Sequence, residues 1–264
     1  MRRRRRVQRS VPFFDGIAEG WAGRYDAATA AGHALRERRR RVLELLGGLR
    51  GDVLDVGCGS AVLADDLVGA GWRYTGVDGS APMVHTAGQR LAAVTGARVG
   101  VADVAALPFP DATFDAVLCI GVLDRVADQG AALREIVRVV RPGGRVVVSF
   151  ANRYSPYAWW NSEVFRPLVG HVKRLLGRTG RSGADLASGA ILHSPRSAQA
   201  LLDAAGAAPA QVVHYHLNVL LSPLDEIVPR LAERLARRLE PLHRSRGRWL
   251  AVGFLVAADR PGPS

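Results

Sequence analysis

A pair of glycines at the end of a short apolar run has the residue types and the spacing of a turn that holds a ligand. Residues 53–59 read Val-Leu-Asp-Val-Gly-Cys-Gly, so the run ends in Gly57 and Gly59. Such a run is typical of a buried strand, and glycine is favoured where the backbone turns sharply or lies against a ligand. The pattern therefore predicts a binding loop at the carboxyl edge of a parallel sheet, where open α/β sheets hold their cofactors.

A carboxylate follows this turn at the distance at which nucleotide-binding folds hold ribose hydroxyls. Residues 73–78 form a second predicted strand, which ends in Asp78. Nicotinamide dinucleotide motifs have Gly or Ala three residues after the second glycine, whereas this chain has Val62 there. The pattern therefore favours a ligand that contains a ribose, and a nicotinamide dinucleotide becomes the less favoured ligand. Glycines that serve only a tight turn are the alternative.

The rest of the chain supplies strands and helices that alternate around this turn. Further strands are predicted at 98–102, 114–120, 145–150, 209–217 and 248–258, and helices at 13–31, 33–46, 60–70, 80–94, 127–140 and 194–206. Alternation of this kind indicates right-handed crossovers and a parallel sheet. We therefore expect an α/β fold with a doubly wound, mostly parallel sheet.

The motifs between residues 53 and 150 resemble the S-adenosylmethionine-binding core of class I methyltransferases, in the methyltransferase type 11 group. Besides the glycine turn and Asp78, the match includes Asp103 after the third strand, Leu-Pro-Phe-Pro before the fourth and Arg-Pro-Gly-Gly before the fifth. One departure is Ala61, which stands where the family has a third glycine. The resemblance implies a Rossmann-like sheet of seven strands whose last strand is antiparallel. The flanking residues are more loosely similar to those of ubiquinone and menaquinone methyltransferases.

The resemblance implies S-adenosyl-L-methionine as the cofactor and indicates the residues that contact it. Asp78 would hold the ribose hydroxyls, and Arg36 matches an arginine that would hold the methionine carboxylate through a bidentate fork. The neighbouring arginines at 38–41 are alternatives to Arg36. The other cofactor-binding residues that the resemblance implies are Tyr25, Asp55, Gly57, Cys58, Gly59, Met83, Asp103, Val104 and Ile120.

The implied reaction is methyl transfer to a small-molecule or lipid-like acceptor, with a hydroxyl oxygen as the first choice. It requires in-line placement of the acceptor and, for a hydroxyl, a base. His193 is the first candidate base because it precedes the helix after the first insertion, and His214 and His216 are second candidates. A C- or N-methyltransferase, or a cofactor-binding or partner-binding relative without catalysis, is the alternative.

No metal site is expected. Quinone O-methyltransferases that resemble this chain carry two glutamates and a histidine after the fourth strand, and the matching residues here are Gly121, Asp124 and Arg125. One carboxylate beside a guanidinium is a poor site for a divalent cation, which takes several oxygen ligands. We therefore expect metal-independent activity.

One catalytic domain, residues 13–264, is expected after a basic arm at residues 1–12. Two cysteines are too few for a secreted disulfide framework, and no apolar run is long enough to span a membrane, so a cytoplasmic protein is predicted. The first 50 residues carry 13 basic and 5 acidic side chains. The arm is either an electrostatic tether to anionic lipid or nucleic acid, or else a solvated tail or a misassigned start. Nucleic acid is the less favoured partner because no aromatic RNA-binding motif accompanies the basic runs.

Two insertions interrupt the predicted fold, at residues 152–192 and 218–246. The first is rich in Trp and Tyr at 154–165, and the second contains a predicted basic amphipathic helix near 224–242. The apolar residues that recur every four positions in this helix are Ile227, Leu231, Leu235 and Leu239. Aromatic rings and arginines favour an anionic bilayer surface, so peripheral docking at the inner face of the membrane is one prediction. The alternative is that both insertions cover the active site, with the leucines packed inward.

Overall fold

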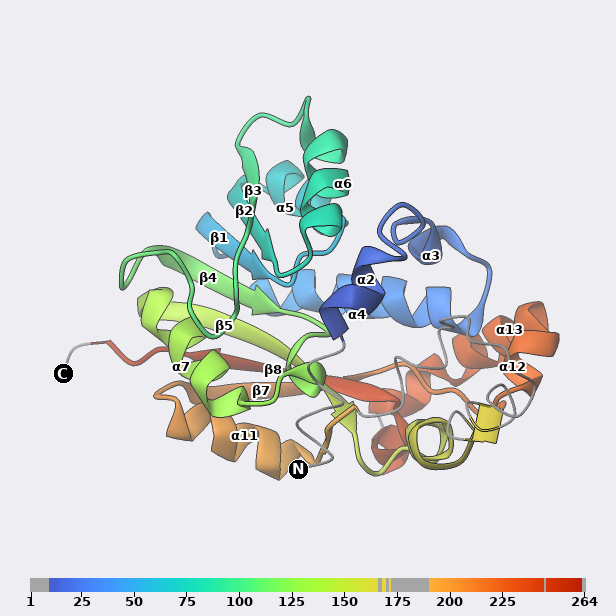
Figure 1. The fold of residues 1–264 in the computed structure, drawn as a ribbon. Coiled ribbons are helices and arrows are strands. Elements are labelled where there is room, and N and C mark those ends of the chain that lie inside the picture. Colours follow the sequence, from blue (N-terminus) through green and yellow to red (C-terminus); the bar gives the residue numbers. More distant parts are fainter. Residues whose placement is uncertain (1–9, 166–167, 170, 172–189, 245, 263–264) are drawn as a thin grey trace.

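A central sheet of eight strands organises the computed structural model, which describes residues 10–165, 168–169, 171, 190–244 and 246–262 (Figure 1). The strand order is β3-β2-β1-β4-β5-β8-β7, with the short strand β6 beside β5. The strands are β1 Gly51–Val56, β2 Trp72–Asp78, β3 Ala97–Val101, β4 Phe114–Cys119, β5 Val140–Asn152, β6 Leu192–His193, β7 Ala208–Tyr215 and β8 Gly253–Asp259. Strand β8 runs antiparallel between β5 and β7, whereas β1 to β6 pair in parallel. The predicted Rossmann-like sheet is confirmed, and the two-residue β6 is added to it.

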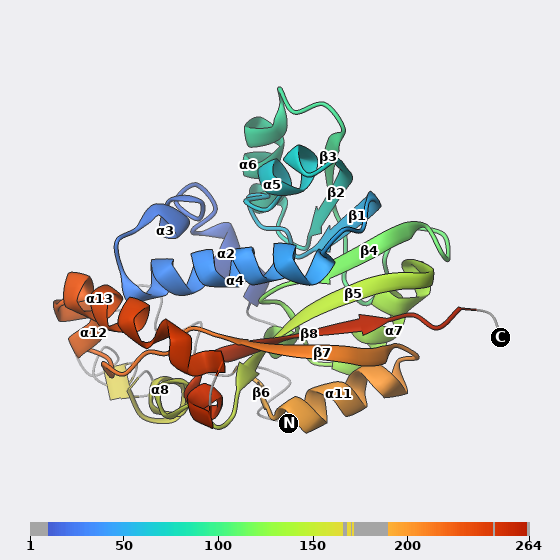
Figure 2. The ribbon, with the colours of Figure 1, turned by 180° about the vertical axis from the view of Figure 1, so that it is seen from behind.

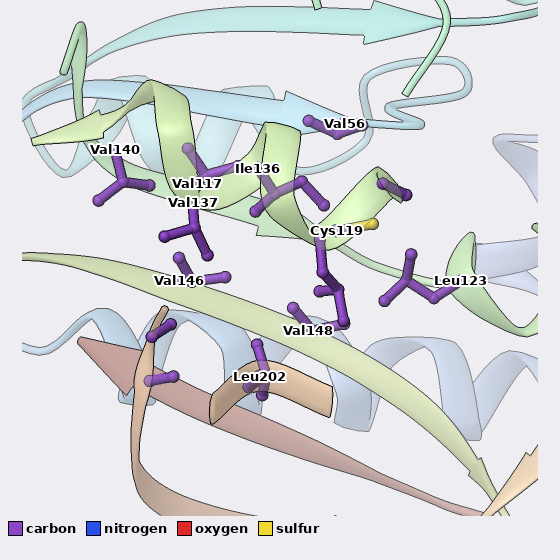
Figure 3. Packing of buried hydrophobic residues seen from close by; sticks show 14 of the residues in the cluster. Val56, Val117, Cys119, Leu123, Ile136, Val137, Val140, Val146, Val148 and Leu202 are labelled. Atoms are coloured by element: carbon purple, nitrogen blue, oxygen red, sulfur yellow. The ribbon is translucent and has the colours of Figure 1, made fainter. Parts of the chain in front are cut away.

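Helices cover both faces of the sheet (Figures 1 and 2). The helical elements are α2 Ser10–Asp15, α3 Gly23–Asp26, α4 Ala30–Leu46, α5 Ala64–Gly69, α6 Ala81–Leu91, η1 Leu123–Arg125, α7 Gln129–Val139, α8 Pro156–Trp159, η2 Trp160–Phe165, α11 Pro195–Ala204, α12 Leu224–Ile227, α13 Pro229–Leu239, η3 Glu240–Arg244 and η4 Arg246–Leu250. Helices α4, α5 and α6 share one buried apolar cluster with the sheet, and α7 and α11 share another. Figure 3 shows the second cluster, in which Val146 and Val148 of β5 lie with Ile136 and Leu202. Because both faces are covered, the central strands are almost continuously apolar.

The prediction of one helix over residues 13–31 is wrong. The chain forms the short helices α2 and α3, with turns between them. Gly16, Gly20 and Gly23 interrupt the segment, and glycine is a poor helix former because it loses the most backbone freedom. Residues 10–26 therefore form two short helices joined by turns instead of one long helix, and this segment is called the strap below.

The predicted helix at 224–242 is also divided. Helix α12 ends at Ile227 and α13 begins at Pro229. Val228, between them, has φ −123° and ψ 61°, which lies outside the helical region. The ring of a proline disfavours a helical conformation in the residue before it, so Pro229 starts a new helix at a changed angle. The last strand begins at Gly253, later than the predicted residue 248, because 3-10 turns fill the interval.

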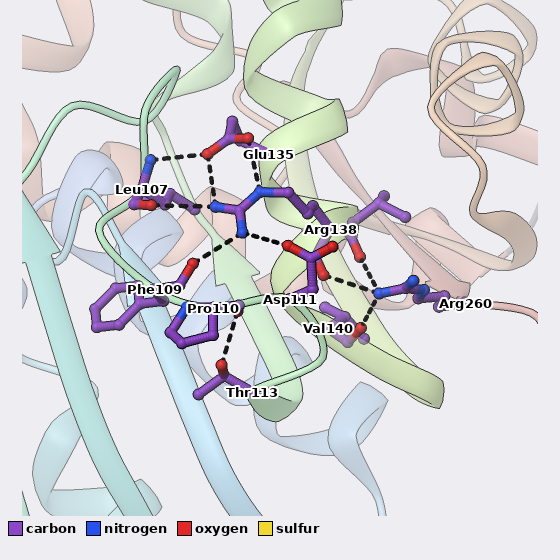
Figure 4. A network of polar contacts seen from close by, with 10 residues as sticks. Leu107, Phe109, Pro110, Asp111, Thr113, Glu135, Arg138, Val140 and Arg260 are labelled. Carbon is purple, nitrogen blue, oxygen red and sulfur yellow. Dashed lines mark hydrogen bonds and ion pairs between the residues drawn. The ribbon is translucent and has the colours of Figure 1, made fainter.

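The Leu-Pro-Phe-Pro segment before β4 is fastened to α7 (Figure 4). The Arg138 guanidinium donates to the carbonyl oxygens of Leu107 at 3.1 Å and Phe109 at 2.8 Å. It also donates to Asp111 at 2.7 Å and to both carboxylate oxygens of Glu135. These bonds hold the loop that leads into β4, so this motif has a structural role beside the site.

Two predicted features fall outside the described residues. They are residues 1–9 of the predicted arm at 1–12 and the basic segment around Lys173 and Arg174. Residues 10–12 of that predicted arm belong to helix α2. Of the first insertion, the structure describes α8, η2 and the approach to β6. Within the part of the chain that is described, no helix is both long and apolar enough to cross a bilayer.

Candidate cofactor and acceptor site

A cavity of about 970 Å³ lies where β1, β2 and β4 end, and helices α2, α3 and α4 contribute to its wall. Its position at the carboxyl edge of the strands is the one predicted for the glycine turn. The predicted cofactor residues on this wall are Gly57, Gly59, Asp78, Met83, Asp103, Val104 and Ile120. The predicted residues that the described wall does not include are Tyr25, Arg36, Asp55, Cys58 and His193.

The glycine turn has a backbone that other residues adopt only with strain. Gly57 and Gly59 have φ values of 74° and 54°, in the left-handed region. A Cβ atom on Gly57 would lie 2.1 Å from Cγ2 of Val122, so the two chain segments could not approach as they do. Ala61, the departure from the family pattern, also has a positive φ of 55°. The turn therefore accepts alanine at its third position despite the steric cost of a Cβ atom in this conformation.

Asp78 is held in place by the backbone around it. Its Oδ2 accepts a hydrogen bond from the N–H of Gly59 at 2.9 Å, and its Oδ1 accepts one from the N–H of Ser80 at 2.9 Å. Burial raises the pKa of Asp78, and the hydrogen bonds from Ser80 and Gly59 oppose this rise. Each carboxylate oxygen can accept a further hydrogen bond, so a fixed anionic acceptor faces the cavity. A ribose diol is a suitable donor for it.

Asp55 and Cys58 lie behind the turn. Asp55 is 2% exposed and accepts a hydrogen bond from the Tyr74 hydroxyl at 3.0 Å. Burial raises the pKa of Asp55 to about 7, against the effect of this hydrogen bond, and the charge of Asp78 adds to the rise. Burial also raises the pKa of the Cys58 thiol. Both residues are placed to support the turn, and the structure does not bring them to the cavity surface.

Arg38, and not Arg36, is the α4 arginine on the described cavity wall, so the structure favours one of the neighbouring alternatives to Arg36. Arg36 donates to the carbonyl oxygens of Tyr25 at 2.6 Å and Ala27 at 3.1 Å, and to Glu233 at 2.8 Å. Side chains two positions apart on an α-helix point to nearly opposite sides, so Arg36 and Arg38 cannot both face the cavity. Arg38 lies beside Gly121, where an added Cβ atom would be 3.1 Å from its Nη1.

The guanidinium of Arg38 is held by two tyrosines. Burial opposes its charge, but interactions with the hydroxyls of Tyr25 and Tyr215 outweigh burial and raise the pKa of Arg38. Tyr25, which the resemblance placed at the cofactor, thus acts on the cavity through Arg38. The result is a fixed cation on the cavity wall, next to Gly121, which follows β4.

The strap formed by α2 and α3 contributes aromatic residues that were not assigned to the site from the sequence. Phe14 and Trp21 line the cavity and pack edge to face, with ring centroids 5.5 Å apart. Nε1 of Trp21 would lie 3.0 Å from a Cβ atom on Gly59. Asp15 accepts a hydrogen bond from the Ser80 hydroxyl at 2.6 Å, which fastens the strap over the site. The sequence feature that could have identified these residues is the clustering of aromatic side chains upstream of the glycine turn.

The loop after β4 forms the other end of the wall. Val122, Val126 and Arg125 line it, and the Arg125 guanidinium lies over the Phe14 ring with its Cζ 5.9 Å from the ring centroid. Asp124 also lines it, with Oδ2 3.7 Å from Nε of Arg125. This end combines apolar surface with one anion and one cation. Among the described residues, no group of three or more His, Cys, Asp or Glu side chains is arranged to hold a metal ion.

His193 is packed inside the protein and does not reach the described wall. Its ring lies on Phe150, with centroids 5.2 Å apart, and its Nδ1 is 3.5 Å from the hydroxyl of Ser197. Burial lowers the pKa of His193, although the charge of Asp124 opposes this. The role of His193 as a base therefore stays a prediction without support from its place in the fold.

The second candidate bases are no closer to the cavity wall. His214 packs on Phe254 and lines a separate small cleft against α4. His216 is 4% exposed, and its ring centroid lies 5.7 Å from that of His33. Burial, with a contribution from the charge of His33, lowers the pKa of His216 to about 3. Neither histidine is placed on the described part of the cavity surface.

Comparison with known proteins matches the core of the chain to one family. Residues 54–148 match the family model described as a methyltransferase domain. The ubiquinone biosynthesis O-methyltransferase of Sodalis glossinidius (strain morsitans) is 34% identical over 151 residues, which cover 55% of this chain and 59% of that protein. The demethylmenaquinone methyltransferase of Mycolicibacterium vanbaalenii is 38% identical over 139 residues, which cover 51% of this chain and 57% of that protein. The matches thus span less than two thirds of either relative.

A solved structure with the same fold contains a cofactor product. The magnesium protoporphyrin IX methyltransferase of Synechocystis PCC 6803, with bound SAH, aligns over 95% of this chain and 97% of its own. The TM-score is 0.59 and the sequence identity is 17%. At this identity the likeness shows the fold alone.

Proposed function

We propose that the core of this chain works as a class I S-adenosylmethionine-dependent methyltransferase domain and that the protein methylates a small amphiphilic acceptor of the quinol type, at a hydroxyl oxygen. The observation that carries the proposal is Asp78, a carboxylate on the cavity wall that two backbone N–H groups fix beside the glycine turn. The names of the two relatives support a quinone-like acceptor.

The residues present fit the cofactor. Asp78 is suited to the ribose hydroxyls, and Arg38 is suited to the methionine carboxylate because its guanidinium offers a bidentate fork. Met83, Asp103 and Ile120 line the same cavity and are assigned to the adenosine end, as the resemblance implies. The absence of side chains at Gly57 and Gly59 lets Val122 and Trp21 pack directly against the turn, which keeps these two wall residues next to the proposed cofactor site. The bound cofactor would supply an electrophilic methyl group.

The chain itself must then orient the acceptor and keep water away. Phe14, Val122 and Val126 offer apolar surface for an aromatic ring on the part of the wall that α2 and the loop after β4 form. Asp124 can accept a hydrogen bond from an acceptor hydroxyl, and Arg125 beside it can donate to an oxygen. Positioning of this kind accounts for a large share of catalysis when the reacting group is already reactive, up to about 7 to 11 kcal/mol.

The test uses a matched set of acceptors. The purified chain is incubated with methyl-labelled S-adenosylmethionine and with isoprenylated quinols that carry a free hydroxyl, alongside their O-methyl ethers, which keep an open ring carbon. We expect fragmentation mass spectrometry to place the label on an oxygen of the free-hydroxyl compounds and to find none in the fully O-methylated ethers. Label on a ring carbon would indicate C-methylation and would contradict transfer to oxygen.

Binding without turnover is the other outcome that would overturn the proposal. Calorimetric titration with S-adenosylhomocysteine shows whether the cavity takes the cofactor, independently of any acceptor. Tight binding with no labelled product across quinols, amines and lipid extracts would identify a cofactor-binding relative without catalysis. The Asp78→Ala protein is the control for both measurements, because it should lose binding and transfer together.

A further inference from the structure

The outer face of helices α12 and α13 exposes a group of large apolar side chains. Leu224 is 53% exposed, Ile227 66%, Val228 39% and Leu231 50%. A monomeric protein usually exposes such residues singly, and a contiguous group indicates an interaction site. The two helices follow each other directly in the chain and lie together at one end of the molecule, so the four exposed residues belong to neighbouring elements (Figures 1 and 2).

Helix α13 packs against α4 through its small residues. Its buried side chains are Ala232, Glu233 and Ala236, and Glu233 accepts hydrogen bonds from Arg36 of α4 at 2.8 Å and from Arg237 at 2.8 Å. Small residues let the two helices approach closely and direct Leu231 away from the core. The expectation that the leucines pack inward is therefore wrong for Leu231.

The same outer face carries cations without acidic partners. Arg230, Arg234 and Arg238 are exposed, and none of them forms an ion pair within the described chain. The nearby acids Glu233 and Glu240 are already paired with arginines of α4, and Asp225 accepts a hydrogen bond from Tyr157. The exposed Glu226 of α12 adds a negative charge, but the three arginines leave the face apolar with a net positive charge.

The aromatic insertion lies directly beside this face. The Tyr157 hydroxyl donates to Asp225 at 2.5 Å, and Nε1 of Trp160 donates to the carbonyl oxygen of Ser222 at 2.7 Å. Trp159, between them in the chain, is 53% exposed. The two insertions, which are separate in the sequence, thus meet in space to form one surface.

We propose that this α12–α13 face, made of Leu224, Ile227, Val228, Leu231, Arg230, Arg234 and Arg238, docks on an anionic lipid bilayer. Apolar side chains flanked by arginines and next to an exposed tryptophan match the interfacial region of a bilayer, where acyl chains meet anionic headgroups. Each arginine near such a leaflet adds about 5-fold to the binding constant at low salt. A second copy of the chain is a poor occupant, because two faces with the same positive charge repel each other.

Docking would bring the cavity close to the bilayer. Helix α13 packs on α4, and the same helix α4 supplies Leu35 and Arg38 to the cavity wall. An acceptor with an isoprenoid tail resides in the bilayer, so the face would place the cavity within its reach. The docking surface itself does not depend on the proposed methyl transfer, and the two are tested separately.

The experiment is co-sedimentation of the full chain with vesicles of phosphatidylglycerol and phosphatidylcholine, at low and high salt. The arginine double variant Arg230→Glu/Arg234→Glu is compared with a matched control, Arg134→Glu/Arg196→Glu, on α7 and α11. Arg134 and Arg196 are also exposed, and the control changes the net charge equally while leaving the arginine arm intact. We expect the α13 variant to lose at least about 20-fold in binding and the control to lose less than about 5-fold.

The apolar part is tested with Ile227→Ser/Leu231→Ser. Because both side chains are exposed, the thermal midpoint and the affinity for S-adenosylhomocysteine should not change, while vesicle binding should fall about 10-fold or more. Absence of co-sedimentation at low salt would overturn the proposal. Equal losses in the two arginine variants would mean attraction by net charge alone. A dimer in sedimentation velocity that the apolar variant abolishes would show that a second copy covers the face.

Discussion

The backbone N–H of Gly59 donates a 2.9 Å hydrogen bond to Oδ2 of Asp78, so the glycine turn and the carboxylate form one rigid unit on the cavity wall. If Asp78 holds the ribose, Asp78→Ala removes charge-assisted hydrogen bonds worth about 1.5 to 3 kcal/mol each. We expect calorimetric titration to show S-adenosylhomocysteine binding weakened at least about 10-fold. Unchanged affinity in a variant that still unfolds cooperatively would contradict the assignment.

Arg38 and Arg36 should separate binding from stability. Arg38→Met removes the cation on the wall, so we expect S-adenosylhomocysteine to bind about 10- to 100-fold more weakly. Arg36→Met removes donors to Tyr25, Ala27 and Glu233 and should instead lower the free energy of unfolding by about 1 kcal/mol. Titration and thermal unfolding of both variants check this, and the reverse pattern would restore the original assignment to Arg36.

Asp55 should make the protein less stable as the pH rises. Its folded pKa of about 7 lies above that of an unfolded aspartate, so between these values the unfolded chain releases a proton that the folded chain keeps. The free energy of unfolding of the wild type, minus that of Asp55→Asn, should therefore fall by up to about 4 kcal/mol between pH 4 and pH 7. Urea unfolding without cofactor measures it, and a difference that is flat with pH would show that Asp55 is ionised.

His216 should act in the opposite direction over nearly the same range. Its folded pKa of about 3 lies below that of an unfolded histidine. Between these two values the unfolded chain binds a proton at this residue and the folded chain does not. The contribution of His216 to stability is complete above pH 6.5 and is lost as the pH falls toward about 3. His216→Asn, which tolerates the positive φ of 55° at this position, should therefore reduce the loss of stability in acid. A variant that is as acid-sensitive as the wild type would exclude this role.

Activity should not depend on a divalent cation. Gly121 has no ligand atom in its side chain, and the carboxylate of Asp124 lies 3.7 Å from the guanidinium of Arg125, which repels a cation. We expect turnover to be unchanged in EDTA and not to rise with added magnesium. A chelator that abolishes turnover, with recovery on adding magnesium, would sink this prediction.

The strands and the glycine turn could be predicted from the sequence because their signals are local. Buried strands are apolar runs, and Gly57 and Gly59 mark the turn whatever surrounds it. Arg36 and Arg38 show what such local signals cannot predict. Two positions apart on one helix, they point to different sides, and the tertiary packing of α4, which pairs Arg36 with Glu233 of α13, determines which one faces the cavity.

The same limit applies to α13. The spacing of Leu231 and Leu235 identifies an apolar side of the helix but cannot tell whether the core or a partner covers it. In the structure the buried residues of α13 are Ala232, Ala236 and Glu233, which is paired with Arg36 of α4, and a sequence gives no strong signal that small side chains such as alanine are buried. Pro229, in contrast, is a local signal, and it could have predicted the break after Val228.

His193 is the remaining test of the reaction chemistry. Its ring is packed on Phe150 and its Nδ1 faces Ser197, so His193→Gln should lower the thermal midpoint while kcat changes less than about 10-fold. The measurements are thermal unfolding and the pH dependence of kcat with the quinol acceptor that is labelled best. A general base would give a different result, because its loss costs about 10² to 10⁴ in kcat and removes one limb of the pH profile. That outcome would return His193 to the active site and would mean that the acceptor approaches from the side of β6.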